Sequence, residues 1–178
     1  MPRIRFRSPW RLAVLLLAAG SFLASGLTGC RMSGPDGPLF VAATQPGPGD
    51  TLVYVYRKDP LRGVPVADIK LDAEDIGELG NGEYLAFLVD PGQHALAARL
   101  WWMGVIPRSW NRIEFTAKPG QTVYLAVWAG YNPADGPAEE LRASSGAEPA
   151  TEVAVYLAQR GIDDAGRDLP EMRRTSGR

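Results

Sequence analysis

The chain has 178 residues, a length typical of one domain with short extensions. Its composition is that of a globular protein, and its 20 glycines and 15 prolines favour short strands and frequent turns over long helices. Residues 1–29 contain four arginines and no acidic residue. The rest of the chain has 15 basic and 20 acidic residues, which gives it a net charge of −5. This charge excludes the basic surface typical of nucleic-acid binding.

Residues 1–29 have the order of parts found in a secretory signal peptide. A basic segment comes first, an apolar run of about 16 residues follows, and small residues precede Cys30. The apolar run is short for a bilayer span, which needs roughly 20 residues. The string Leu27-Thr28-Gly29-Cys30 resembles the lipobox of bacterial lipoproteins. This resemblance implies cleavage after Gly29, a diacylglycerol group on the sulfur of Cys30, and an acyl group such as palmitate on the new amino terminus.

Cys30 is the single cysteine, so it has no disulfide partner within the chain. Two or three acyl chains would attach the protein durably to a membrane. Arg31 stands where enteric lipoproteins that stay in the inner membrane have aspartate, which implies the outer membrane, facing the periplasm, in a Gram-negative host. The alternative is an uncleaved N-terminal anchor helix with an incidental cysteine.

Residues 30–50 predict a flexible tether between the lipid and the folded domain. The segment is rich in glycine and proline and has too few apolar residues to fold alone. Its one apolar patch, from Leu39 to Ala43, could add an edge strand to a sheet.

Residues 51–130 have the pattern of a β-sandwich domain. Alternating or short apolar runs occupy residues 51–57, 66–72, 84–89, 93–102, 112–117 and 122–129. Pro91-Gly92 and Pro119-Gly120 predict type II turns between them. We therefore expect a mostly β fold, an antiparallel β-sandwich of Ig-like or prealbumin-like form, with one short C-terminal helix.

Residues 131–161 predict a loop and a short helix packed on the sheet. The segment from Thr151 to Arg160 fits a helix and also fits a strand, in which Val153, Val155 and Leu157 would share one face. Arg160 and Gly161 at its end favour the helix. Residues 162–178 are charged and show no apolar period, which predicts a disordered tail.

Several short motifs resemble those of a family of small bacterial lipoproteins, the family of unknown function numbered 2846. These motifs are Tyr54–Arg57, Asp75–Leu79, Gly82–Tyr84, Pro91–His94 and Gly120–Leu125. The resemblance spans roughly residues 50–130 and implies export and a fold like a β-sandwich. It implies no reaction, and the segment from Trp101 to Trp110 does not match it.

No residue pattern predicts catalysis or a metal site. His94 is the only histidine and follows a Pro-Gly turn, so we expect it to cap that turn or to lie on the surface. The acidic residues from Asp68 to Glu78 lack the spacing of a calcium loop and are interpreted as solvated turn residues. Phosphate-binding and nucleophile motifs are also missing from the sequence, so we expect no enzyme activity and no cofactor besides the covalent lipid on Cys30.

Aromatic residues near the predicted strand ends are the candidate contact surface: Trp101, Trp102, Trp110 and Tyr131. In an extended strand Trp101 and Trp102 face opposite sides, so one of them is either exposed or covered by the following loop. Aromatic side chains are enriched at binding surfaces. Coverage by the loop or by the C-terminal segment is the structural alternative.

The sequence thus predicts a non-enzymatic envelope lipoprotein whose sandwich binds another envelope protein, as an accessory or structural component. The alternative function is a binding module for a small or polymeric envelope ligand, such as peptidoglycan or lipid. That module would use the aromatic surface around Trp101 and Trp110.

Overall fold

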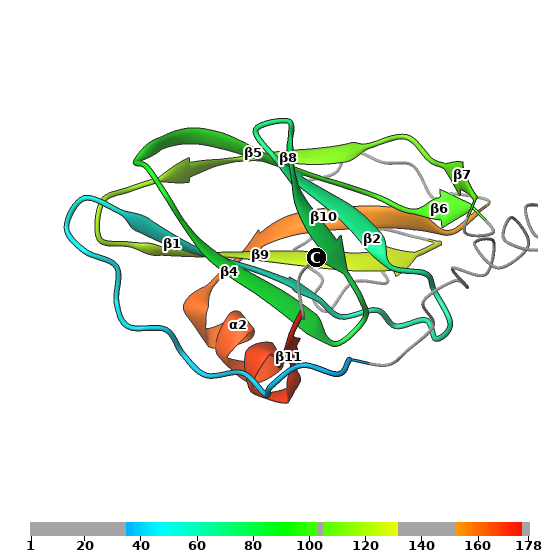
Figure 1. The fold of residues 1–178 in the computed structure, drawn as a ribbon, viewed down its shortest axis with the longest axis horizontal. Helices are drawn as coiled ribbons and strands as arrows, with labels where there is room; N and C mark the ends of the chain where they lie inside the picture. Colours follow the sequence, from blue (N-terminus) through cyan, green and yellow to red (C-terminus); the bar gives the residue numbers. More distant parts are fainter. Residues whose placement is uncertain (1–34, 103–104, 132–151, 176–178) are drawn as a thin grey trace, which may run out of the picture. The chain divides into compact units, whose positions relative to one another are not determined.

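The computed structural model describes residues 35–102, 105–131 and 152–175. Met32–Arg178 forms one compact unit, separate from Met1–Arg31. The described part of this unit is a β-sandwich of two sheets with one short C-terminal α-helix (Figure 1). This fold class is as predicted, although the helix begins after the segment in which it was expected. Because the unit contains its own hydrophobic core, it can fold without the first 31 residues.

The two main sheets are mostly antiparallel. Sheet A contains β1 (Thr51–Arg57), β4 (Glu83–Val89), β9 (Thr122–Gly130), β10 (Ala154–Arg160) and β11 (Arg173–Arg174), in the order β10-β9-β1-β4-β11. Sheet B contains β2 (Ala67–Leu71), β3 (Glu74–Leu79), β5 (Gly92–Arg99) and β8 (Asn111–Ala117), in the order β3-β2-β5-β8. The short strands β6 (Trp101–Trp102) and β7 (Ile106–Pro107) pair with each other. Two pairs in sheet A, β1 with β9 and β11 with β4, are parallel.

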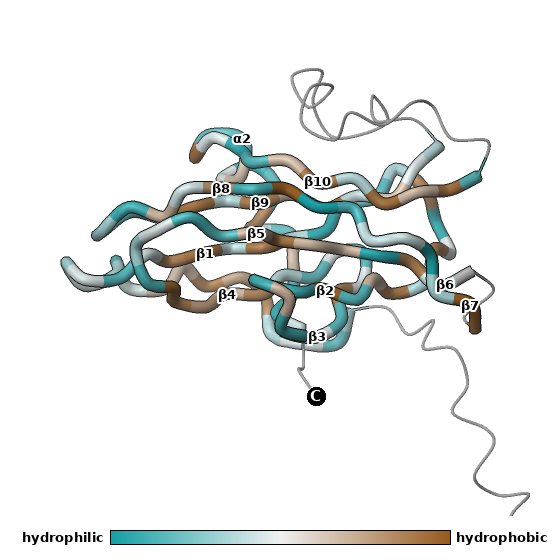
Figure 2. Tube along the Cα trace, turned by 90° about the horizontal axis from the view of Figure 1, so that it is seen from above, coloured by the Kyte–Doolittle hydropathy of each residue, from teal (hydrophilic) through white to brown (hydrophobic). Residues whose placement is uncertain are grey.

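The main core lies between the sheets, and it is built by the alternation predicted from the sequence. Its fully buried members include Val53, Val55, Leu125, Ile69, Leu96 and Ala98. β1 is buried on its other face as well, which explains why its sequence is an almost unbroken apolar run. Figure 2 shows hydrophobic stretches along β1 and β4, and a hydrophobic end at β7.

The outer face of sheet A is covered by α2 (Ile162–Asp168) and by the 3-10 helix η3 (Leu169–Glu171). Figure 1 shows α2 on the side of sheet A that faces away from sheet B. Ala165, Leu169 and Met172 are buried there, in a cluster that includes Tyr54 and Tyr56. The disordered tail predicted for residues 162–178 is therefore wrong for residues 162–175. The overlooked signal is the presence of these three apolar residues, of which Ala165 lies in α2, Leu169 begins η3 and Met172 follows it.

The helix predicted from Thr151 to Arg160 is also wrong, because this region forms β10. β10 pairs with β9 along its whole length, from Ala154 opposite Gly130 to Arg160 opposite Tyr124. This pairing buries Val155 and Leu157 in the main core. Gly161, expected to end a helix, is instead the N-cap of α2 with an extended backbone.

The flexible tether predicted for residues 30–50 is wrong from Gly37 to Ala43, a segment that we call the strap. The amide of Phe40 donates to the carbonyl of Met172, and the Phe40 ring packs edge-on against Tyr54 and Tyr84. Leu39 forms a single bridge with Arg173 and no longer edge strand. Residues 30–34 lie outside the described residues. α2 covers only part of the outer face of sheet A. Phe40 of the strap packs on Tyr54 and Tyr84 beside it.

The predicted strands of residues 51–130 are confirmed in position, and β3 is an additional strand. The acidic residues of β3 had been interpreted as turn residues, but the turn is limited to Asp72 and Ala73, which have φ values of 49° and 74°. The predicted type II turn at Gly120 is supported by a φ of 71° and by a hydrogen bond from the Gln121 amide to the Lys118 carbonyl. Gly92 instead has a φ of 154° and already belongs to β5, unlike the turn predicted there. No helix among the described residues is long and apolar enough to cross a membrane.

Candidate functional site

The outer face of sheet B brings Trp101 and Trp110 together around Arg99. The guanidinium carbon of Arg99 lies 4.9 Å from the ring centre of Trp101 and 4.5 Å from that of Trp110. The ammonium nitrogen of Lys70 lies 4.8 Å from the ring centre of Trp110. A cation within about 6 Å of a ring centre is attracted to the negative face of the ring. Two aromatic side chains and two cations therefore form one contiguous surface.

Asp68 fixes this arrangement by accepting two hydrogen bonds. Its Oδ2 atom accepts from Nε of Arg99 at 2.8 Å and from Nε1 of Trp101 at 2.9 Å. The Arg99 side chain is 24% exposed and that of Asp68 is 14% exposed, so both are within reach of a partner and still held in place. We call Asp68, Lys70, Arg99, Trp101 and Trp110 the tryptophan–arginine cluster.

Strand register explains how these residues meet. Asp68 lies directly opposite Arg99 in the pairing of β2 with β5, and Lys70 lies opposite Ala97. Ala97 lies opposite Arg112 of β8, which places Trp110 next to Arg99. The core residues of the same strands point to the other side, because side chains alternate along a strand.

The structure thus joins two of the predicted contact residues, Trp101 and Trp110. The backbone of Trp102 pairs with Ile106 in β6 and β7, but its side chain lies outside the described part of the chain. Tyr131 follows β9 in sheet A, where it is 51% exposed, and the contacts of the cluster do not include it. Cys30, the predicted lipidation site, lies outside the described residues.

Sequence reasoning missed Asp68, Lys70 and Arg99. The signal was present, because alternation places Arg99 on the face opposite to Leu96 and Ala98. It was overlooked because a charged residue on a strand ordinarily indicates only a solvated face. Cross-strand neighbours cannot be identified until the register is known.

The cluster has a positive charge on a chain that is otherwise acidic. Lys70 and Arg99 carry two positive charges against the single carboxylate of Asp68. The neighbouring ion pair between Arg112 and Glu114, at 2.7 Å, adds no net charge. In the pairing of β2 with β3, Glu78 lies opposite Asp68 and Asp75 lies opposite Lys70, so two further carboxylates border the cluster on its β3 side.

His94 lies away from the cluster and holds a turn, as the sequence predicts. Its Nδ1 atom lies 2.6 Å from a carboxylate oxygen of Asp72, and its Nε2 atom lies 2.7 Å from the carbonyl oxygen of Asp90. Both neighbours are acceptors, so they favour the protonated imidazole, in which both ring nitrogens donate. The hydrogen bond with Asp72 accordingly raises the pKa of His94, although burial opposes this effect. Burial also disfavours the charged form of Asp72, but hydrogen bonds from His94 and the Ala95 amide outweigh it and lower the pKa of that carboxyl.

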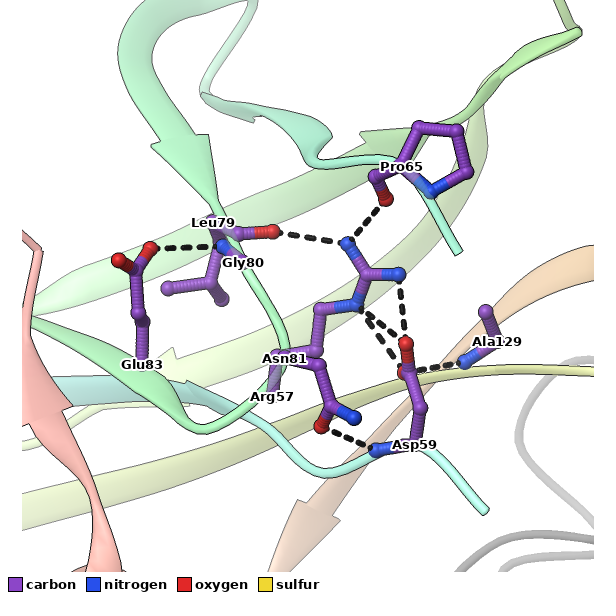
Figure 3. Close-up of polar contacts among 8 residues, drawn as sticks. All are labelled: Arg57, Asp59, Pro65, Leu79, Gly80, Asn81, Glu83 and Ala129. Atoms are coloured by element: carbon purple, nitrogen blue, oxygen red, sulfur yellow. Dashed lines mark hydrogen bonds and ion pairs between the residues drawn. The ribbon is translucent and has the colours of Figure 1, made fainter. Parts of the chain in front are cut away.

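A buried ion pair closes one end of the sandwich (Figure 3). Both side chains of Arg57 and Asp59 are fully buried, with Nη2 of Arg57 2.6 Å from Oδ2 of Asp59. Nη1 of Arg57 donates to the carbonyls of Pro65 and Leu79, each at 2.8 Å. The carboxylate of Asp59 also accepts from the Ala129 amide at 2.8 Å. These bonds connect both sheets and the loop after β1, so the pair has a structural role.

Within the part of the chain that the structure describes, no group of three or more histidine, cysteine, aspartate and glutamate side chains could hold a metal ion. Comparison with protein-family models and with curated proteins finds no match to this chain. Its resemblance to the lipoprotein family stays a prediction, and the candidate site rests on its geometry.

Proposed function

We propose that the chain is a lipid-anchored envelope protein without catalytic activity, whose sandwich binds another envelope protein through the tryptophan–arginine cluster, as an accessory or structural component. The observation that carries this proposal is the position of Arg99 over the rings of both Trp101 and Trp110. Tryptophan and arginine are the residues most enriched where protein interfaces gain their energy. Because Asp68 already orders Arg99 and Trp101, a partner would lose little side-chain entropy on binding.

The proposed anchor is the lipid on Cys30, in an outer membrane facing the periplasm if the host is Gram-negative. The strap begins at Gly37, so at most six residues, 31–36, separate it from Cys30 in the sequence. Six residues reach about 20 Å at most. The sandwich would therefore stay near the membrane surface and select partners that are located there.

Mass spectrometry of the mature protein tests the anchor. We expect a chain that begins at Cys30 and carries two or three acyl chains. A mature protein that begins at Met1 would contradict the lipoprotein proposal.

The second candidate function is binding of a flat polymer, such as a glycan strand, on the indole rings. Trp101 and Trp110 favour this function, because both are partly exposed and aromatic ring faces suit such ligands. The ring of Trp110, however, already has both Arg99 and Lys70 over it. A glycan would have to displace these cations, whereas a partner protein can pack against the rings and the cations as they stand. We therefore prefer the protein partner.

Native electrophoresis of detergent-solubilised membranes tests the protein-binding surface. The wild-type chain should migrate in a larger complex, and Trp110→Ala or Arg99→Gln should release it. Leu88→Ala is the matched control, because Leu88 is 57% exposed but belongs to sheet A. Identical migration of all four proteins would contradict the proposed surface, and dissociation by added glycan fragments would support the second candidate.

A further inference from the structure

A pocket of about 490 Å³ lies on the outer face of sheet A, remote from the tryptophan–arginine cluster. Its walls come from three segments: the strap and the residues that follow it, the strands β1 and β9, and α2 with η3. Apolar and aromatic side chains dominate the lining, among them Phe40, Leu52, Tyr54, Tyr124, Ile162 and Leu169. A volume in the range of about 300–1,000 Å³ is typical of sites for small molecules.

Two tyrosine rings form a flat wall of this pocket. The rings of Tyr54 and Tyr124 stack with centres 5.7 Å apart and planes inclined by 6°. The hydroxyl of Tyr54 is already engaged, because it accepts a hydrogen bond from the Ala43 amide at 2.7 Å. That bond ties the strap to the pocket wall. Tyr54 is 3% exposed, so the partly exposed Tyr124 ring is the one of the pair that is open to a ligand.

Arg160 is the only charged residue among the described residues that line the pocket. It ends β10 opposite Tyr124, and its side chain is only 3% exposed. Nη2 of Arg160 lies 3.3 Å from a carboxylate oxygen of Asp164, but Asp164 also pairs with Arg167. One carboxylate is thus shared by the buried Arg160 and the largely exposed Arg167, and the side chain of Tyr56 also lies near Arg160.

The Nε atom of Arg160 has no hydrogen-bond partner within the described residues, although it is buried. A buried donor without a partner is unfavourable, and a donor on a charged group especially so. Because Arg160 lines the pocket, an anionic group bound there would lie beside this guanidinium and could form a charge-assisted hydrogen bond with it. The pocket therefore offers an apolar body and one anion-binding end.

From this combination we infer that the pocket binds a single-chain amphiphile with a carboxylate head, such as a fatty acid. The acyl chain lies against accessible lining residues, Tyr124 and Ile162 among them, and the carboxylate binds Arg160. This inference is independent of the proposed partner-binding surface, which lies on the other sheet.

Calorimetric titration of the compact unit Met32–Arg178 tests the inference. The ligand concentrations stay below the critical micelle concentration of dodecanoate and below the solubility limit of dodecanol. Dodecanoate should bind saturably with a stoichiometry of one. Dodecanol has the same chain without the charge. Its affinity should be lower by a factor of about ten or more, because it loses the charge-assisted hydrogen bond. Arg160→Met should remove the difference between the two ligands.

Two variants with the same threonine-to-tryptophan change, one inside the pocket and one outside it, separate filling of the pocket from general damage to the fold. Thr122→Trp places a large side chain in the pocket lining and should abolish binding of both ligands. Thr116→Trp introduces the same residue on the exposed face of sheet B and should leave binding unchanged. If Arg160→Met does not fold, the two ligands and this pair of variants still decide the question.

Absence of saturable dodecanoate binding would overturn the inference. Equal affinities of dodecanoate and dodecanol for the wild-type unit, or binding that Thr122→Trp leaves intact, would overturn it as well. Trp110→Ala should not affect this titration, so failure here and failure of the proposed partner surface are distinguishable.

Discussion

Replacing Asp59 with alanine tests whether the buried ion pair stabilises the sandwich as the structure indicates. The substitution leaves the fully buried guanidinium of Arg57 without its counter-charge and leaves the Ala129 amide without its acceptor. Breaking a buried pair on one side typically costs about 3–5 kcal/mol. A domain of this size is stable by about 5–15 kcal/mol, so the loss is a large share of the total.

Urea denaturation of Met32–Arg178 measures this loss. With an m value of about 2 kcal/mol per molar urea, the midpoint of Asp59→Ala should fall by roughly 2 M. The double variant Arg57→Met, Asp59→Ala should lose less than the sum of the two single variants, because the two residues interact directly. A midpoint within experimental error of wild type, or strict additivity in the double variant, would refute the structural role assigned to the pair.

Three further changes probe other parts of the fold. Leu169→Ala should lower the unfolding free energy by about 2–5 kcal/mol in the same urea assay, since Leu169 is 1% exposed; no change would show that η3 does not cover sheet A. In Gly37→Ala the new Cβ atom would lie 1.7 Å from the carbonyl oxygen of Arg174, so hydrogen exchange of the Phe40 amide should accelerate as the strap is displaced; unchanged protection would contradict that close approach. The pKa of His94 is raised above its ordinary value of 6.5, so its contribution to stability is complete below that pH and is lost as the pH rises through the raised value. His94→Gln should remove that part of the pH dependence, which amounts to less than about 1 kcal/mol for a partly exposed pair, and a pH profile identical to that of wild type would contradict the assignment.

The strands of the sandwich could be predicted because their alternation is local information. In β5 and β8 every second residue is apolar, and this period alone assigns Leu96 and Phe115 to the core. The parallel pairing of β1 with β9 could not be predicted, because nothing in either strand specifies its neighbour.

Residues 151–160 were predicted to be helical because Arg160 and Gly161 are typical of a helix end. These two residues indicate that an element ends there, but not whether that element is a helix or a strand. Gly161 ends β10 and begins α2, while the sequence pattern is also that of a helix end. What decides for a strand is the free edge of β9, which exists only in the folded sheet. Tertiary pairing overrides local preference here.

Two of the five residues of the candidate site were accessible from the sequence. Trp101 and Trp110 were identifiable as aromatic residues at strand ends, but their common neighbour Arg99 depends on the register of β2, β5 and β8. Arg160 in the pocket was likewise visible only as an apparent helix-stop residue. Its meaning follows from its burial, which no local pattern shows.

Photo-crosslinking in living cells tests the central claim most directly. Arg112 is exposed and borders the tryptophan–arginine cluster, so a photoreactive amino acid in its place samples that surface, while the same residue in place of Leu88 samples sheet A. We predict one adduct of defined mass from position 112, its loss in Trp110→Ala, and no such adduct from position 88. An adduct that persists in Trp110→Ala, or equal adducts from both positions, would contradict the claim that this face binds an envelope partner.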